Sequence, residues 1–157
     1  MPGGIRERQQ VTVPSGGEPS AFLSIDALKL VHVPVYDRGL DSQRRMLIAP
    51  GYSVTHYVRS SPIGGGSNVV LYGHDDMEGE IFKDLSTLHD GDLIQLDRVN
   101  AARTSYRVKG GPTFVGANAV GILDQASKQK LTLFTCYPYL VDNQRVVIEA
   151  FPGGQQD

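Results

Sequence analysis

Short apolar runs separated by turn residues dominate this sequence, and they restrict the fold more than any other feature. NVVLYG, KLTLFTC and RVVIEAF are rich in β-branched and other apolar residues, and Gly, Pro, Asn and Asp lie between such runs. From Ala21 onward the chain contains about seven or eight strands of this kind and little helix. The pattern predicts an all-β domain, either a small closed barrel or a sandwich.

One segment, EGEIFKDLSTLHDGD, departs from the strand pattern. Its apolar residues recur at i, i+1, i+4 and i+7, which places them on one face of a helix that Gly91 would end. These residues are Ile81, Phe82, Leu85 and Leu88. A second helical turn is expected within NAVGILDQAS. We therefore expect one or two short helices beside the strands.

Length and composition point to one globular domain. The chain has 157 residues, of which 40% are hydrophobic and 20% charged. Residues 1–20 are rich in Gly, Pro, Ser and Gln, so we expect a flexible arm there and a folded domain over 21–157.

Charge and cysteine content exclude several classes of protein. The net charge is −2 and no block of Lys or Arg stands out, which disfavours a nucleic-acid or anionic-membrane partner. The single cysteine excludes an intrachain disulfide and a Cys-rich zinc site. No apolar run approaches the ~20 residues that span a bilayer, and the first residues lack the apolar core of a signal peptide.

The single thiol and a nearby arginine form the first candidate site. Cys136 ends one strand-like run and Arg145 begins the next. If the two runs pair across residues 137–144, Cys136 and Arg145 lie opposite each other, with Cβ atoms about 4.5–5.5 Å apart. A cation there favours the thiolate and can bind an oxyanion. The alternative is a buried, inert thiol and a surface arginine.

A cysteine nucleophile needs a proton acceptor, and His74 is the best placed of the histidines. His32 and His56 lie within strand-like runs, and His89 lies near a predicted helix end. His74 follows the buried run NVVLYG, at a strand end where Gly73 allows a turn. The alternative is a solvated histidine in a turn.

Two other motifs predict no ligand. GGGS is followed by a strand and no lysine, unlike a phosphate-binding loop. An acidic cluster lacks the spacing of a calcium loop and is expected to be a solvated turn, so no metal or cofactor is expected. That cluster consists of Asp75, Asp76, Glu78 and Glu80.

Three motifs together resemble the sortase family. TLFTCYP followed by Arg145 is similar to the sortase signature in which Thr-Leu-X-Thr-Cys ends a strand and an arginine begins the next. LYGHDDMEGEIFKDLSTLHDGD is similar to the family's histidine segment, and LSIDALKLVHVPVY and GGGSNVVLYGH resemble its early strands. The resemblance runs from about Ala21 to Phe151.

The resemblance implies a fold and a reaction. Sortases are extracytoplasmic cysteine transpeptidases built on a closed eight-stranded β-barrel. They cleave a sorting signal of Leu-Pro-X-Thr-Gly type between Thr and Gly, hold the acyl group as a thioester and pass it to an amine. The implied roles are Cys136 as nucleophile, His74 as general acid and base, and Arg145 as the clamp for the oxyanion or substrate. The implied substrate-binding residues are Thr135, Val120, Ile122 and Leu123.

The implied partners are the sorting signal of a secreted surface protein and an amine acceptor, either a cell-wall precursor or a protein amine. Sortases are tethered by a transmembrane helix that this sequence lacks, so we expect an ectodomain that acts at the cell surface. Residues 1–20 contain no Asp-Pro-aromatic lid, and the acidic residues of calcium-dependent members have no match. The subclass, the sorting motif and the acceptor stay open.

Three other functions are alternatives to that of a sortase. L,D-transpeptidases also use Cys and His, but a Gly precedes their cysteine and an arginine follows two residues later, unlike Thr135 and Arg145 here. A sortase-like binding module without activity would not need the three catalytic residues. A thiol hydrolase differs from a transpeptidase only in using water as the acceptor.

Overall fold

The computed structural model describes most of the chain from residue 18 to residue 153. The described residues are 18–40, 42, 53–73, 81–98, 101–116, 121, 124–126, 128–137 and 144–153. The expected arm therefore lies almost entirely outside them. Ser20 lies within them, and its backbone N–H donates to the carbonyl of Val35 at 2.8 Å.

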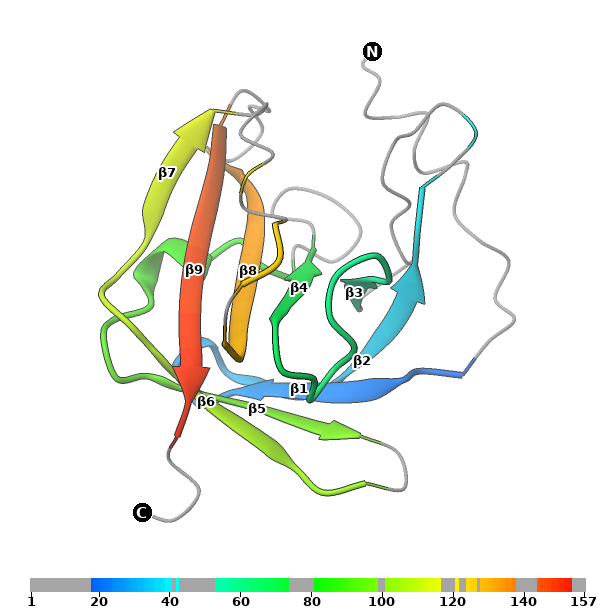
Figure 1. Cartoon of the computed structure of the whole chain (residues 1–157). Coiled ribbons are helices and arrows are strands. Elements are labelled where there is room, and N and C mark those ends of the chain that lie inside the picture. Colours follow the sequence, from blue (N-terminus) through cyan, green and yellow to red (C-terminus); the bar gives the residue numbers. More distant parts are fainter. Residues whose placement is uncertain are drawn as a thin grey trace.

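Eight strands close a barrel, as Figure 1 shows. Around the barrel the order is β6-β5-β1-β2-β3-β4-β8-β9, and β9 pairs with β6 to complete the ring. The strands are β1 (Ala21–Ile25), β2 (Leu30–Arg38), β3 (Val54–Tyr57), β4 (Asn68–Tyr72), β5 (Leu93–Arg98), β6 (Thr104–Val108), β8 (Lys130–Tyr137) and β9 (Gln144–Pro152). A further strand, β7 (Thr113–Gly116), pairs with the first half of β9. The all-β class and the closed eight-stranded barrel are confirmed.

Two parallel pairings arrange the strands around the site. β2 pairs with β3 and β4 pairs with β8 in parallel, whereas the other neighbours are antiparallel. The β4–β8 pairing brings together strands from the middle and the end of the chain, so their C-terminal ends lie at the same edge of the barrel.

Apolar side chains on the inner faces of the strands fill the barrel. Leu23 and Ile25 of β1, Leu131 and Leu133 of β8, and Ile148 of β9 are all fully buried in one cluster. They alternate with residues on the outer face, as the period of a strand requires. Burying each such side chain stabilises the fold by about 1.5–3 kcal/mol.

β2 contains an irregularity beside β1. Its pairing with β1 shifts register between Leu23 and Ile25, and the consecutive residues Val31 and His32 are both exposed. His32 has a positive φ of 54° and stacks on Phe22 at 4.2 Å between ring centroids. His32 is therefore a surface residue of a bulged strand.

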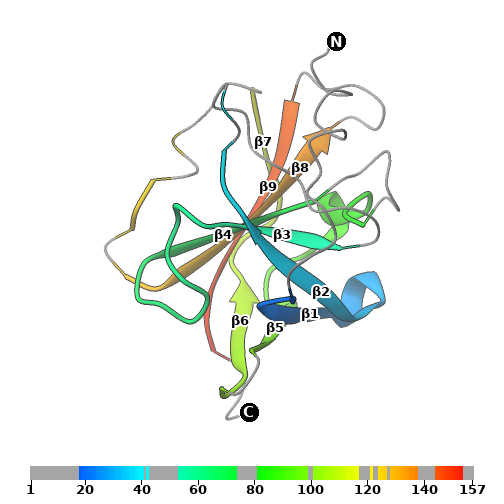
Figure 2. The ribbon, with the colours of Figure 1, turned by 90° about the vertical axis from the view of Figure 1, so that its right-hand side faces the viewer.

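The predicted apolar face over residues 81–88 is correct in its burial but not in its helix type. Ile81, Phe82, Leu85 and Leu88 are all buried against the barrel core. Only Leu85–Thr87 forms a helix (η2), a 3-10 turn, because Leu88 is already extended with ψ at 146°. A second 3-10 turn, η1 (Asp26–Leu28), joins β1 to β2, and both lie at one side of the barrel in Figure 2.

No helix in the described ranges is long and apolar enough to cross a membrane.

Candidate active site

The ends of β8 and β9 place the candidate thiol beside the candidate arginine. In their antiparallel pairing Cys136 lies directly opposite Arg145, followed by Phe134 opposite Val147. β8 and β9 run side by side in Figure 1. The predicted register is confirmed, and it brings together two residues separated by a chain reversal.

Arg145 is held against an aromatic ring. Its Cζ atom lies 5.8 Å from the centroid of Phe134, in the geometry of a cation–π contact. Phe134 in turn stacks on Tyr72 of β4, with centroids 5.2 Å apart and the rings inclined by 18°. The arginine is half-buried, so its charge is positioned and partly shielded from water.

The end of β4 lies beside the end of β8. Their parallel register pairs Tyr72 with Phe134, and the next residue, Gly73, makes one hydrogen bond to Thr135 and one to Phe134. The Thr135 hydroxyl donates to the carbonyl of Gly73 at 2.7 Å, and the Gly73 N–H donates to the carbonyl of Phe134 at 3.4 Å. The residue before His74 is thus joined to the residue before Cys136.

Gly73 has no room for a side chain. A Cβ atom there would lie 2.5 Å from Cγ2 of Ile81 and 3.2 Å from a ring carbon of Phe82. Because Ile81 and Phe82 are buried, they cannot easily move aside. The glycine therefore allows the chain after β4 to lie in close contact with Ile81 and Phe82.

A second apolar cluster lies on the outer face of the sheet, next to the candidate site. We call it the outer cluster; it consists of Tyr57, Val70, Tyr72, Phe134 and Val147, with Leu40 and Val115 packed against it. Sequence reasoning did not identify it. The signal was present in the uninterrupted apolar run of β4, whose residues are buried on both faces.

The predicted substrate-binding residues have different outcomes. Thr135 is only 3% exposed, and its hydroxyl is occupied by the bond to Gly73. Val120, Ile122 and Leu123 lie outside the described residues, as do His74 and the acidic residues 75–80. Within the described ranges, no group of three or more His, Cys, Asp or Glu side chains could hold a metal ion.

A second cluster of titratable residues resembles a catalytic triad, but its hydrogen bonds serve to hold two strands together. His56 Nδ1 lies 2.9 Å from the Asp37 carboxylate, and its Nε2 lies 3.4 Å from the Ser60 hydroxyl. Nε2 lies closer, at 2.9 Å, to the carbonyl of Ser61. The Ser60 hydroxyl donates to the carbonyl of Tyr57 at 2.6 Å, so its proton is already bonded to the backbone. Both Ser60 and His56 are buried, and the cluster ties β2 to β3.

Asp37 carries the one resolved pKa shift in this cluster. The hydrogen bond from His56 lowers the pKa of the Asp37 carboxyl below its ordinary value of 3.8, although partial burial opposes this change. A further hydrogen bond comes from the Ser20 hydroxyl at 2.9 Å. The carboxylate is therefore the preferred form in the folded chain.

Comparison with protein families gives one match, which covers most of the chain. The family model described as "Sortase domain" matches residues 23–152. No curated protein matches the sequence.

Solved structures with the same fold come from several bacteria. The pilus-related sortase C of Group B Streptococcus is 20% identical, with a TM-score of 0.71, over 90% of this chain and 71% of that one. Sortase C-1 of Actinomyces oris is 24% identical, with a TM-score of 0.71, over 98% and 84%. A lid mutant of sortase A from Corynebacterium diphtheriae is 23% identical, with a TM-score of 0.72, over 98% and 81%.

Proposed function

Because the chain belongs to the sortase family, we propose that it is a cysteine transpeptidase that acts through a thioester on Cys136. The proposed substrate is a C-terminal sorting signal of Leu-Pro-X-Thr-Gly type, and the acceptor is an amine. The product would be a surface protein joined covalently to a cell-wall precursor or to another protein.

The single observation that supports this proposal is the meeting of three strand ends. Arg145, the second residue of β9, lies opposite Cys136, and Gly73, the residue after β4, is bonded to Thr135. The three residues required for the chemistry therefore belong to, or directly follow, neighbouring strands. A buried inert thiol needs no such arrangement.

In the proposed first half-reaction, the Cys136 thiolate attacks the carbonyl carbon of the scissile Thr-Gly bond. The new C–S bond creates an oxyanion, which the Arg145 guanidinium binds. The C–N bond then breaks, and the His74 imidazolium donates a proton to the leaving amine. A thioester and a free amino terminus result.

In the second half-reaction, an incoming amine attacks the thioester carbonyl and gives a proton to His74. The tetrahedral intermediate again places its negative oxygen against Arg145. Collapse breaks the C–S bond, restores the thiolate and leaves a new amide. Water in place of the amine gives hydrolysis by the same steps.

Arg145 is suited to this role by its contact with Phe134. The aromatic ring helps to hold the guanidinium in place opposite the cysteine. An oxyanion that forms only during the reaction can then be bound more strongly than the neutral carbonyl, which is the requirement for catalysis.

The reaction can be tested with a library of sorting peptides, with and without a labelled amine, analysed by mass spectrometry. Transpeptidation predicts a peptide–amine adduct and a thioester intermediate that hydroxylamine releases. Hydrolysed product alone, in the presence of saturating amine, would identify a thiol hydrolase. Absence of both products across the library would favour a binding module.

The proposed location is the outer surface of the cell, where sorting signals and cell-wall amines meet. Tethering to the membrane by a segment outside this sequence belongs to the same proposal. Surface labelling of the full-length protein in intact cells tests it.

A further inference from the structure

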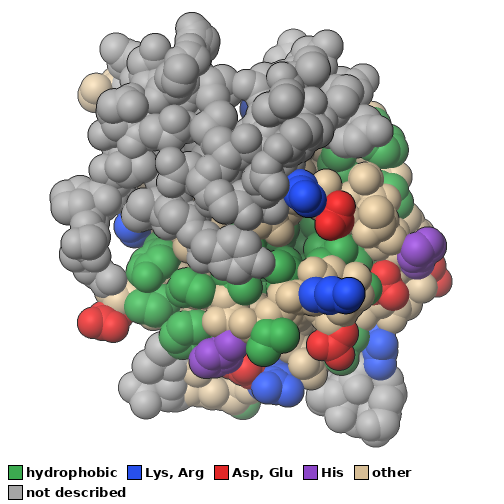
Figure 3. Space-filling model, turned by 180° about the vertical axis from the view of Figure 1, so that it is seen from behind, with side chains coloured by type: hydrophobic (Ala, Val, Ile, Leu, Met, Phe, Trp, Pro, Cys, Tyr) green, Lys and Arg blue, Asp and Glu red, His purple; other side chains and the backbone are tan. Residues whose placement is uncertain are grey.

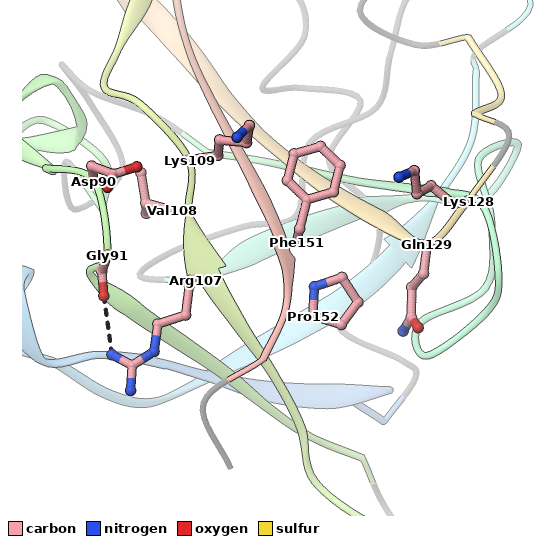
Figure 4. Close-up of a pocket in the computed structure, with 9 residues that line it drawn as sticks. All are labelled: Asp90, Gly91, Arg107, Val108, Lys109, Lys128, Gln129, Phe151 and Pro152. Carbon is pink, nitrogen blue, oxygen red and sulfur yellow. Dashed lines mark hydrogen bonds between the residues drawn. The ribbon is translucent and has the colours of Figure 1, made fainter. Parts of the chain in front are cut away.

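A solvent-open pocket of about 740 Å³ lies where the ends of β6 and β9 meet. Figure 4 shows its lining residues, which come from the ends of these two strands, from the turn before β5 and from the residues before β8. Those with charged or apolar side chains relevant to binding are Asp90, Arg107, Lys109, Lys128, Phe151 and Pro152.

The pocket is positively charged although the chain is not. It contains three basic side chains and one acidic side chain, a net charge of +2, whereas the whole chain carries −2. The acidic group, Asp90, accepts a hydrogen bond from the Gly110 N–H at 2.6 Å. The nearby Glu149 carboxylate is paired with Lys130 at 2.8 Å.

Two of the three basic side chains have no acidic partner among the described residues. Among the described residues, neither Lys109 nor Lys128 makes an ion pair, and both are exposed. Arg107 differs, since its guanidinium donates to the carbonyl of Gly91 at 3.0 Å, as drawn in Figure 4. The pocket therefore offers two ammonium groups to an anion from outside.

An apolar surface separates these two ammonium groups. Phe151 is directly opposite Arg107 in the β6–β9 ladder and is half-buried. Its ring lies between Lys109 and Lys128 in Figure 4, and Pro152 follows it. A ligand that fits has at least two negative groups and an apolar group between them.

The openness of the pocket favours a peptide chain over a small molecule. Small-ligand sites commonly bury 70–90% of their ligand, whereas both lysines, Asp90 and Pro152 here are exposed. A chain can cross such a pocket and leave at both sides. On the face seen in Figure 3, by contrast, basic and acidic side chains are interspersed.

We propose that this pocket binds an acidic peptide segment, with carboxylates against Lys109 and Lys128 and an apolar side chain against Phe151. Phe151 and Arg145 lie on the same face of β9, six residues and about 20 Å apart. The pocket is thus separate from the candidate active site, and its occupation does not depend on the proposed transpeptidase chemistry.

The test is fluorescence anisotropy at low salt with a short labelled peptide in which Asp or Glu flank a Leu or Phe. Two comparison peptides replace the acids by Asn and Gln, or the apolar residue by Gly. We expect the acidic, apolar peptide to bind most tightly. Its affinity should fall as salt is raised, because exposed charges are screened.

The variants Lys109→Gln and Lys128→Gln should each weaken binding about two- to fivefold, and the double variant about tenfold. Phe151→Ala should also weaken it, and Phe151→Leu should restore part of the loss. Lys29→Gln, which removes the same charge from an exposed residue before β2, is the matched control and should bind normally. Unchanged melting temperatures show that the variants fold.

Equal binding by the double variant and the wild type would overturn the proposal, as would equal binding of the neutral peptide. Lysine-dependent binding of a small aromatic sulfonate or of anionic vesicles, without binding of the peptide, would overturn the assignment to a peptide.

Discussion

The two ends of β9 use the same outer face of the same strand in different ways. At the Arg145 end, the cation is half-buried and packed on Phe134, whereas at the Phe151 end the ring is flanked by exposed lysines. The neighbouring strands differ as well: β7 pairs with the first half of β9, and β6 with the last residues. A cation held in place by packing is suited to bind a single oxyanion, whereas exposed cations around an aromatic ring are suited to bind a peptide.

The largest expected effect is that of Cys136→Ala, which should affect the two ends of β9 differently. Cys136→Ala should abolish thioester formation, since no other thiol exists in the chain, and should leave the affinity for the acidic peptide unchanged. Mass spectrometry of the trapped intermediate and anisotropy on the same preparation measure both. Residual thioester would contradict the role of Cys136, and lost peptide binding would contradict the separation of the sites.

Arg145→Lys tests whether activity depends on the geometry of the guanidinium at the Arg145 end of β9 or only on its charge. The lysine keeps the charge but loses the planar fork, so kcat/KM for a sorting peptide should fall about 10²–10³-fold. Arg103→Lys is a control, since Arg103 is exposed and paired with Asp97 on the surface. Near-wild-type activity of Arg145→Lys would reject the clamp role.

Gly73→Ala tests the close packing behind the candidate active site. The added methyl group would collide with Ile81, and overpacking of this kind costs about 1–3 kcal/mol of unfolding free energy. Because His74 directly follows Gly73 in the chain, kcat should fall by more than the loss of folded protein explains. Gly111→Ala, where a Cβ atom would meet nothing within 4 Å, is the control. If Gly73→Ala and Gly111→Ala lowered kcat equally, the packing of Gly73 against Ile81 would have no role in positioning His74.

Thr135→Val tests the link between β4 and β8 with a smaller change. The valine keeps the shape but leaves the Gly73 carbonyl without its donor, which should cost about 1–2 kcal/mol of stability. If Thr135 positions His74 through this bond, kcat falls while KM for the sorting peptide is kept, and Thr135→Ser recovers most of the loss. A change in KM alone would instead support the groove-lining role predicted for Thr135.

The smallest expected effect concerns the Asp37–His56 pair, which joins β2 to β3. Because folding lowers the pKa of Asp37, the pair stabilises the fold above the ordinary pKa of 3.8, and this contribution is lost as pH falls through the folded value. The melting-temperature difference between wild type and Asp37→Asn should therefore be present at neutral pH and shrink in strong acid. A constant difference would show that the charge of Asp37 is irrelevant.

Much of the candidate site followed from the sequence because it depends on strand alternation. The register of Cys136 with Arg145 required only that two adjacent strands pair across a short loop, which local pattern predicts well. The number and spacing of the strands predicted an all-β domain, either a closed barrel or a sandwich, and the resemblance to sortases implied the closed barrel.

The remainder depends on contacts between distant segments, which periodicity does not encode. The parallel pairing of β4 with β8 and the Thr135–Gly73 bond join residues far apart in the chain. The sequence did not predict the pocket either, because Lys109 and Lys128 are far apart in the chain. They line one pocket only because the end of β9 lies between them. The helical pattern at 81–88 predicted the correct buried face, but the chain is already extended at Leu88, so only the 3-10 turn Leu85–Thr87 forms.

The closure of the barrel by β9 has a consequence for how activity arises during synthesis. The same strand that seals the ring against β6 carries Arg145, and it follows the other seven barrel strands in the chain, so the ribosome releases it after them. Pairings between such distant segments form late in folding. We therefore expect a nascent chain to pair Cys136 with Arg145 early, in the local β8–β9 hairpin, and to gain activity only when the distant pairings of β4 with β8 and of β6 with β9 have formed.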